Sequence, residues 1–279
     1  MDLPLARQPG QKTSLEGLIR AAKRADVILL RMVGEESYLD GATVYLSETH
    51  PQVVEANGAY DLRVPPGGDA AQIVDALINK FTEAGSTCFT CDASEPEWPA
   101  PLAAALEARG YQPQTLAMAQ LAAYAPPALV DDQLQVIPGR AAYNELHRIY
   151  TERYQATGAG SPEDAAKARV DQLDDPRVDL FLARRDRQPV GLTGLLTLGN
   201  IGVVLDLFTA PTCDDPAVLN TLASHLVDYC MRAQFEQVIA RFDPADSRRP
   251  FFESLGFKVV GQYVRYCKQE KKASKEMRK

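Results

Sequence analysis

The sequence predicts an α/β fold of the α+β kind in which one structural unit occurs twice along the chain. Two similar stretches indicate this, PLAAALEARGYQPQTLAMAQL at residues 101–121 and RRPFFESLGFKVVGQYVRY at residues 248–266. Each has an apolar helical segment that ends in a glycine followed by an aromatic residue, Gly110-Tyr111 and Gly256-Phe257. Glycine suits the left-handed position that ends a helix, and the aromatic residue then begins a strand.

The same offset of 146 residues separates Asp69 from Asp215, each of which stands where the N-cap of a helix is expected. Helical periodicity follows both aspartates, and strand-like alternation lies on either side of each helix. The repeated elements are strand, helix and strand at 59–65, 69–85 and 86–93, and again at 202–211, 215–234 and 236–243. Five ordered elements at one offset predict a tandem duplication.

The other elements follow from the same patterns. Before the first repeat we expect a helix at 14–25 and strands at 26–33 and 42–48; before the second we expect a strand at 134–139, helices at 140–156 and 161–173, and three strands within 179–211. Pro126-Pro127 and the acids after them interrupt the periodicity. The predicted organisation is a first domain at 1–125, a linker at 126–131, a second domain at 132–268 and a disordered charged tail at 269–279.

Composition excludes several classes of function. The 279 residues have a formal net charge of −7, which argues against nucleic acid as a partner because phosphate binding needs a basic face. No apolar run is long enough for a membrane span, and residues 1–12 lack the apolar core of a secretory signal. Five cysteines, an odd number, fit a reducing compartment. We therefore expect a cytoplasmic protein with no membrane partner.

Several motifs read together resemble the GNAT superfamily of acyl-CoA-dependent N-acyltransferases. QPVGLTGLLTL at 188–198 resembles the family's second-to-third strand hairpin, LDLFTAP at 205–211 its fourth strand, and the LGF ending at 255–257 its closing helix. The first half resembles the degenerate first domain of tandem members of the family. The resemblance implies two domains, each with a mixed, mainly antiparallel central sheet flanked by helices. It also implies acetyl-CoA as co-substrate and a small-molecule or peptide amine as acceptor.

The resemblance places acetyl-CoA in the second half. Pantetheine in this family pairs with the fourth strand as an extra strand would, which implies contacts along Leu207, Phe208 and Thr209. The pyrophosphate loop then falls on residues that depart from the family's Arg/Gln and glycine pattern: Asp214, Asp215, Ala217 and Leu219. Two carboxylates there oppose a phosphate by like-charge repulsion. The alternative is that Asp215 serves only as an N-cap.

The catalytic groups are less defined. Asp206 is the carboxylate within the expected fourth strand, and alternation predicts that Leu205 and Leu207 share the opposite face of the sheet. Asp206 is therefore a candidate base, with a structural aspartate as the alternative. The family's tyrosine, which protonates the leaving thiolate, falls on Phe252.

Two functions from different classes remain open at this point. The first is an N-acetyltransferase that uses acetyl-CoA. The second is a non-catalytic binding or interaction protein of the same fold that has lost the pyrophosphate loop. The Cys88–Cys91 pair has CxxC spacing, but a single pair without histidines cannot complete a tetrahedral metal site, so no metal is predicted.

Overall fold

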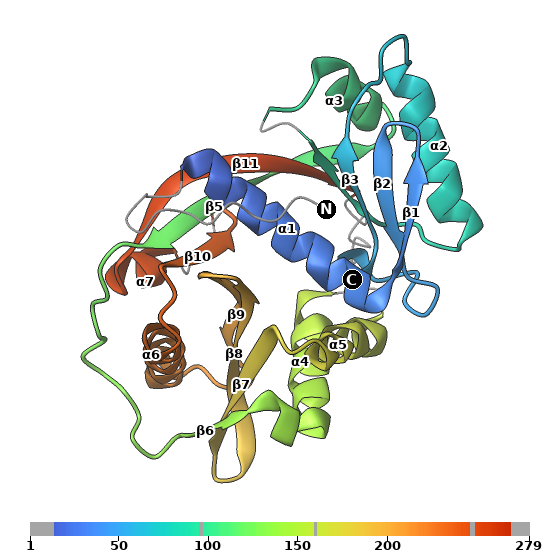
Figure 1. Ribbon diagram of the computed structural model, residues 1–279. Helices are drawn as coiled ribbons and strands as arrows, with labels where there is room; N and C mark the ends of the chain where they lie inside the picture. The colour runs from blue at the N-terminus through green and yellow to red at the C-terminus, as the bar shows by residue number, and fades with distance from the viewer. Residues whose placement is uncertain (1–13, 95–96, 159–160, 246–248, 269–279) are drawn as a thin grey trace, which may run out of the picture.

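The computed structural model describes residues 14–94, 97–158, 161–245 and 249–268, and its strands form one eleven-stranded sheet. The order of the strands is β1-β2-β3-β4-β11-β5-β10-β9-β8-β7-β6. Figure 1 shows the sheet curving around helix α1, which crosses its concave side. The predicted tail at 269–279 lies outside the described residues.

Both halves of the chain contain helices and strands. The first half contains α1 (Leu15–Val33), β1 (Glu35–Leu39), β2 (Ala42–Leu46), β3 (Gly58–Leu62), α2 (Ala70–Glu83), β4 (Thr90–Ala93), α3 (Ala100–Glu107) and β5 (Tyr111–Leu121). The second half contains β6 (Gln135–Pro138), α4 (Tyr143–Thr157), α5 (Pro162–Asp171), β7 (Val178–Arg185), β8 (Gln188–Leu198), β9 (Ile201–Thr209), α6 (Pro216–Arg232), β10 (Gln237–Phe242), α7 (Arg249–Ser254) and β11 (Phe257–Lys268).

The last strand of each half lies in the sheet of the other half. Strand β11 lies between β4 and β5, and β5 lies between β11 and β10. The two pair antiparallel along their whole length, from Phe257 opposite Leu121 to Lys268 opposite Tyr111. Read outward from this central pair, the order is β11-β4-β3-β2-β1 on one side and β5-β10-β9-β8-β7-β6 on the other. The two halves thus share one order over five strands, as the repeat predicts, and β6 is a sixth strand of the second half. They exchange their final strands.

The local features of the repeat agree with the sequence. Asp69 and Asp215 are both N-caps, and their side chains accept hydrogen bonds from the amides of Ala71 and Ala217. β3 pairs in parallel with β4, and β9 pairs in parallel with β10. The other neighbouring strands of the sheet are antiparallel. The predicted mixed, mainly antiparallel sheet flanked by helices is therefore confirmed.

Helices cover both faces of the sheet. α1, α4 and α5 pack on the concave face around a core that includes Leu146, Ile149 and Leu192. On the convex face α2 and α3 cover the first half, while α6 and α7 cover the second. No helix in the described ranges is both long and apolar enough to cross a bilayer.

One predicted strand is wrong. Residues 26–33 continue α1 instead of forming a strand. Short apolar runs fit a buried helix as well as a strand, and here Leu18, Ala22, Ala25 and Leu29 place one helical face in the core. Strand β1 follows this longer helix and was not predicted.

The two repeated glycines offer a matched pair of substitutions. Both have positive φ, +85° at Gly110 and +95° at Gly256. A Cβ on Gly256 would lie 1.6 Å from the carbonyl oxygen of Ala123, whereas no atom lies within 4 Å of one on Gly110. We expect Gly110→Ala to lower the free energy of unfolding by about 1–2 kcal/mol, through the strain of its left-handed backbone alone. Gly256→Ala should lower it by more than about 3 kcal/mol, because the backbone must also move away from the new Cβ. Urea unfolding of both variants measures this, and equal losses would contradict it.

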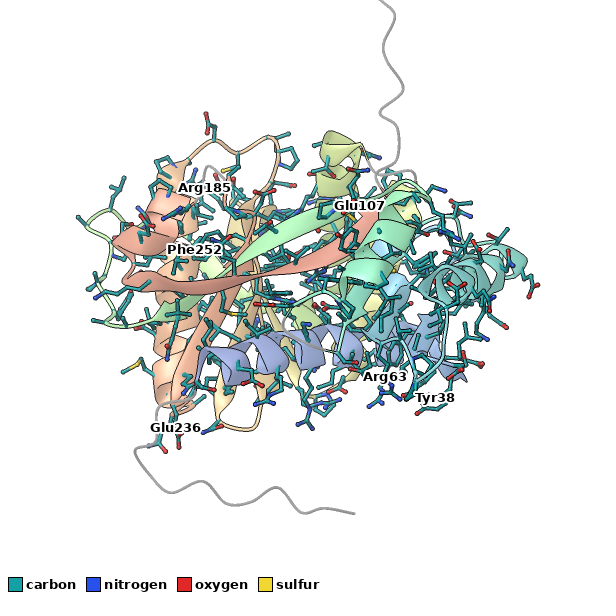
Figure 2. The ribbon with its side chains drawn as sticks, turned by 90° about the horizontal axis from the view of Figure 1, so that it is seen from above. Tyr38, Arg63, Glu107, Arg185, Glu236 and Phe252 are labelled. Carbon is teal, nitrogen blue, oxygen red and sulfur yellow. The ribbon has the colours of Figure 1, made fainter. Side chains whose placement is uncertain are left out.

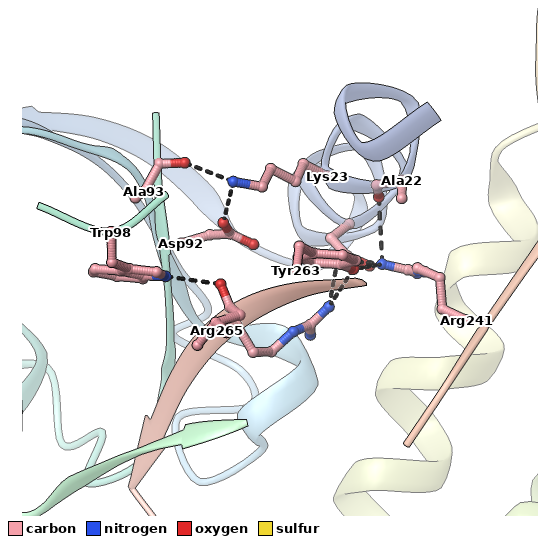
Figure 3. A network of polar contacts seen from close by, with 10 residues as sticks. Ala22, Lys23, Asp92, Ala93, Trp98, Arg241, Tyr263 and Arg265 are labelled. Atoms are coloured by element: carbon pink, nitrogen blue, oxygen red, sulfur yellow. Dashed lines mark hydrogen bonds and ion pairs between the residues drawn. The ribbon is translucent and has the colours of Figure 1, made fainter. Parts of the chain in front are cut away.

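A buried ion pair holds α1 to the sheet. Lys23 Nζ donates to the carbonyl of Ala93 at 2.8 Å and lies 2.6 Å from the Asp92 carboxylate, as Figure 3 shows. Asp92 is 1% exposed. Burial raises the pKa of Asp92 to about 6 even though the charge of Lys23 opposes the shift.

This raised pKa predicts the pH dependence of stability. The folded protein holds the Asp92 proton more tightly than the unfolded chain, so the stabilisation is present below about pH 4 and is lost as the pH rises through about 6. Two pKa units correspond to roughly 3 kcal/mol. We expect the unfolding free energy of the wild type to fall, relative to Asp92→Asn, between pH 4 and 7. The exposed Asp228→Asn serves as control, and a pH-independent difference would exclude Asp92 as the titrating group.

Candidate functional site

A cavity of about 470 Å³ lies on the concave side of the sheet, where the two halves meet. Its walls come from α1, β3, β4 and β5 of the first half and from α4, α5, β9, β10 and β11 of the second. This volume is that of a small-molecule site.

The cavity lies where β9 and β10 part. Their parallel ladder covers only Ile201–Val203, whereas β9 continues to Thr209 in pairing with β8. Val204, Leu205 and Asp206 of the parted segment line the cavity. In the first half, by contrast, β3 and β4 remain paired as far as Leu62 and Ala93. The open splay is therefore in the second half, and Leu207, Phe208 and Thr209 lie on it.

A β-bulge changes which side chains face the cavity. Gly194 pairs with Asp206 and Leu195 with Val204, so β9 has one extra residue at Leu205. Leu205 packs with the concave core and Leu207 with the convex core. The predicted shared face of these two leucines is wrong, because simple alternation assumes a regular strand. Leu205 and Asp206 both face the concave side.

Asp206 is buried within a cluster of hydrogen-bond donors. Its Oδ2 accepts from Tyr150 Oη at 2.8 Å and from Arg169 Nη2 at 2.7 Å, and Arg153 Nη1 lies 3.5 Å from Oδ1. Burial alone would raise the pKa of Asp206, but the charges of Arg169 and Arg153 and these hydrogen bonds outweigh it and lower the pKa. Asp206 is therefore a poor proton acceptor near neutral pH. We expect it to position Tyr150 and the arginines.

A second carboxylate on the cavity wall has the same arrangement. Asp26 of α1 lies 2.5 Å from Arg241 Nη1 and 2.9 Å from Arg265 Nη2. Both arginines also contact the hydroxyl of Tyr263 (Figure 3). Burial would raise the pKa of Asp26, yet the two arginines lower it. Nothing in the sequence pattern joins a residue of the first helix to two residues near the end of the chain.

The predicted phosphate loop lies at the N-terminus of α6. Asp214 is exposed, while Ala217 is buried and Leu219 partly buried. Asp215 caps α6 and also accepts a hydrogen bond from Arg185 at 2.6 Å. Arg185 also forms an ion pair with Asp131 at 2.6 Å. Its guanidinium therefore neutralises part of the negative charge of this loop.

Phe252 lies in the convex core, at the same end of the molecule as Arg185 (Figure 2). Its ring stacks on Phe242 with the centroids 5.3 Å apart. The position where the resemblance expects a thiolate-protonating tyrosine is therefore an apolar packing position.

Glu55 was missed by the sequence reasoning. It lies on a 3₁₀ turn at Val54–Ala56, is exposed, and lines both the central cavity and an adjoining cavity of about 260 Å³. It forms no ion pair with any residue in the described part of the chain. Tyr154 lines both cavities too. Burial, followed by the charge of Glu55, raises the pKa of Tyr154. No motif marks Glu55, and only the fold brings it to the splay.

Within the described ranges, no group of three or more histidine, cysteine or acidic side chains is arranged to hold a metal ion. Cys91 is a buried free thiol, whereas the Cys88 thiol donates to the carbonyl oxygen of Gln52 at 3.3 Å. Burial raises the pKa of Cys91, which leaves it a packing residue.

No family model matches the sequence, and no curated protein resembles it closely enough to count as a match. Solved structures do resemble the fold. A GCN5-related N-acetyltransferase from Kribbella flavida matches with a TM-score of 0.61 at 11% identity, over 92% of this chain and 98% of its own. A functionally unknown conserved protein from Staphylococcus epidermidis matches with a TM-score of 0.62 at 13% identity, over 85% and 95%. A tandem GNAT protein from the clavulanic acid biosynthesis pathway matches with a TM-score of 0.51 at 16% identity, over 81% and 77%.

The likenesses extend over most of the chain, so they include both repeated halves and not one alone. With the shared strand order and the splay between β9 and β10, they confirm the predicted architecture. This chain has the fold of the GCN5-related N-acetyltransferases.

Proposed function

We propose that the protein transfers an acetyl group from acetyl-CoA to an amine held in the central cavity. One observation supports this above the others: the two strands that part in the second half, β9 and β10, open directly on that cavity. A pantetheine arm along β9 would lie between the strands as an added strand does. Its thioester end would then reach the cavity wall at Leu205 and Asp206.

The fit to acetyl-CoA is good at the splay and poor at the phosphates. The side chain of Asp215 accepts from the Ala217 amide, a first-turn donor that would otherwise face an anion. The exposed carboxylate of Asp214 adds repulsion. Arg185 is the cation best placed to offset this, since it is about one-third exposed and already bridges two carboxylates at this surface.

The transfer requires a neutral amine. Its nitrogen forms a bond to the thioester carbonyl carbon, the carbon–sulfur bond breaks, the amine loses a proton, and the thiolate gains one from solvent. Positioning of the reactants then supplies much of the rate.

We propose Glu55 as the group that accepts the amine proton. Asp206 already accepts hydrogen bonds from Tyr150 and Arg169 and pairs with Arg153, which lowers its pKa. Glu55 has no such partners among the described residues and lines the same cavity. The thiolate then takes its proton from water, since Phe252 has none to give.

The second candidate is a non-catalytic binding protein of the same fold. The capped α6 terminus and the core position of Phe252 favour it. A measurement of acetyl-CoA binding distinguishes the two functions, because only the acetyltransferase requires this co-substrate.

Removing the charge of Asp214 should strengthen acetyl-CoA binding. We expect Asp214→Asn to improve the affinity measured by calorimetry about threefold at low salt, with the gain lost at high salt through screening. Asp228→Asn, exposed near the other end of the same helix, is the control. Weaker binding by Asp214→Asn would mean that the loop is misplaced. Absence of binding by every form would support the non-catalytic function.

Loss of the Glu55 carboxylate should change the pH profile of transfer. We expect Glu55→Gln to reduce kcat/KM at least tenfold near pH 7. The loss should shrink above about pH 9, where more of an amine is already unprotonated. Release of free thiol with a panel of amino acids and small amines measures this, with exposed Glu48→Gln as control. A loss that is the same at all pH values would assign Glu55 a positioning role.

A further inference from the structure

The central cavity has more positive than negative charge, although the whole chain has a net charge of −7. Its basic residues are Arg153, Arg169, Arg241, Arg265 and Lys268, and its acidic residues are Asp26, Glu55 and Asp206. Charge enclosed in this way is unfavourable unless a counter-charge meets it. The cavity is therefore suited to an anion.

The surplus positive charge lies in two clusters, because Asp206 and Asp26 are each paired with two arginines. In the first cluster Arg169 is the tight partner of Asp206 at 2.7 Å, whereas Arg153 lies at 3.5 Å and is 30% exposed. In the second, Arg241 is the tight partner of Asp26 at 2.5 Å and Arg265 lies at 2.9 Å. Arg265 Nε is buried and has no hydrogen-bond partner among the described residues. Arg153 and Arg265 are the more distant partner in each cluster, and we take them as the arginines available to a further carboxylate.

We propose that the central cavity binds a small molecule with two carboxylate groups, one at Arg153 and the other at Arg265. The binding of this anion follows from the cavity alone. That the molecule is also the amine acceptor rests on the proposed function, and it would make the substrate an amino acid with a second carboxylate.

The chemistry of the arginines favours carboxylates. The guanidinium is a planar fork whose two N–H groups match the two oxygens of a carboxylate. Arg153 is held over the ring of Phe208, 3.9 Å from its centroid, which fixes the plane of its fork. Residues of the helices α1, α4 and α5 line the cavity, and its volume of about 470 Å³ is that of a small-molecule site.

Calorimetry with glutarate tests the anion site in the absence of acetyl-CoA. We expect glutarate to bind and its uncharged analogue glutaramide not to. Arg153→Gln and Arg265→Gln should each weaken glutarate binding about tenfold. Both variants leave the shared carboxylate with its tighter arginine, and melting temperatures verify the fold. Arg249→Gln, whose partner Glu253 is exposed on α7, is the matched control and should bind as the wild type does.

Equal binding of glutarate and glutaramide would overturn the proposal, and so would an equal loss in Arg249→Gln. If either cavity variant fails to fold, the comparison of glutarate with glutaramide in the wild type still decides. Inorganic phosphate is titrated in the same way. If phosphate binds as tightly as glutarate and through the same arginines, the assignment of the site to carboxylates is wrong.

A separate assay of acetyl transfer to glutamate and aspartate distinguishes this proposal from the proposed function. Arginine-dependent glutarate binding without any transfer would leave the anion site standing and remove the acetyltransferase function. Transfer to amines that lack carboxylates, with no glutarate binding, would support the acetyltransferase function and exclude the anion site.

Discussion

The antiparallel pairing of β5 with β11 is the constraint on which the rest of the molecule depends. Each strand belongs in sequence to one half and completes the sheet of the other. Without β11, β4 would be an open edge, and without β5, β10 would be one. Exposed edges favour pairing with other chains. The exchange therefore makes a single continuous sheet out of two repeats and places the central cavity at their seam.

The seam also explains why buried charge is retained there. Removing one partner of a buried ion pair is costly, whereas replacing the whole pair with apolar residues is often neutral. Two clusters of arginines around single carboxylates, together with Lys23 and Asp92, are therefore a poor solution for stability alone. The Asp26 and Asp206 clusters line the central cavity, where the proposed anion would meet their surplus positive charge.

Much of the fold could be predicted from the sequence because the repeat is a local signal. The Gly110 and Gly256 turns and the Asp69 and Asp215 caps each depend on a few neighbouring residues, and all four lie where the 146-residue offset places them. The exchange of β5 and β11 could not be predicted, because the alternation of a strand does not name its neighbours. The bulge at Leu205 and the position of Glu55 on the cavity wall could not be predicted for related reasons. The bulge depends on how β9 pairs with β8, and the position of Glu55 depends on how the two halves meet at the cavity.

The exchanged strands also determine when the sheet can close. Tyr266 pairs with Cys91, so a contact in the middle of the first half's sheet waits for almost the last described residue of the chain. During synthesis from the N-terminus, the first repeat leaves the ribosome without the strand that will fill the gap between β4 and β5. Contacts so distant in sequence are slow to form, and the incomplete state exposes apolar surface. The exchange thus makes completion of the first half's sheet depend on the arrival of β11.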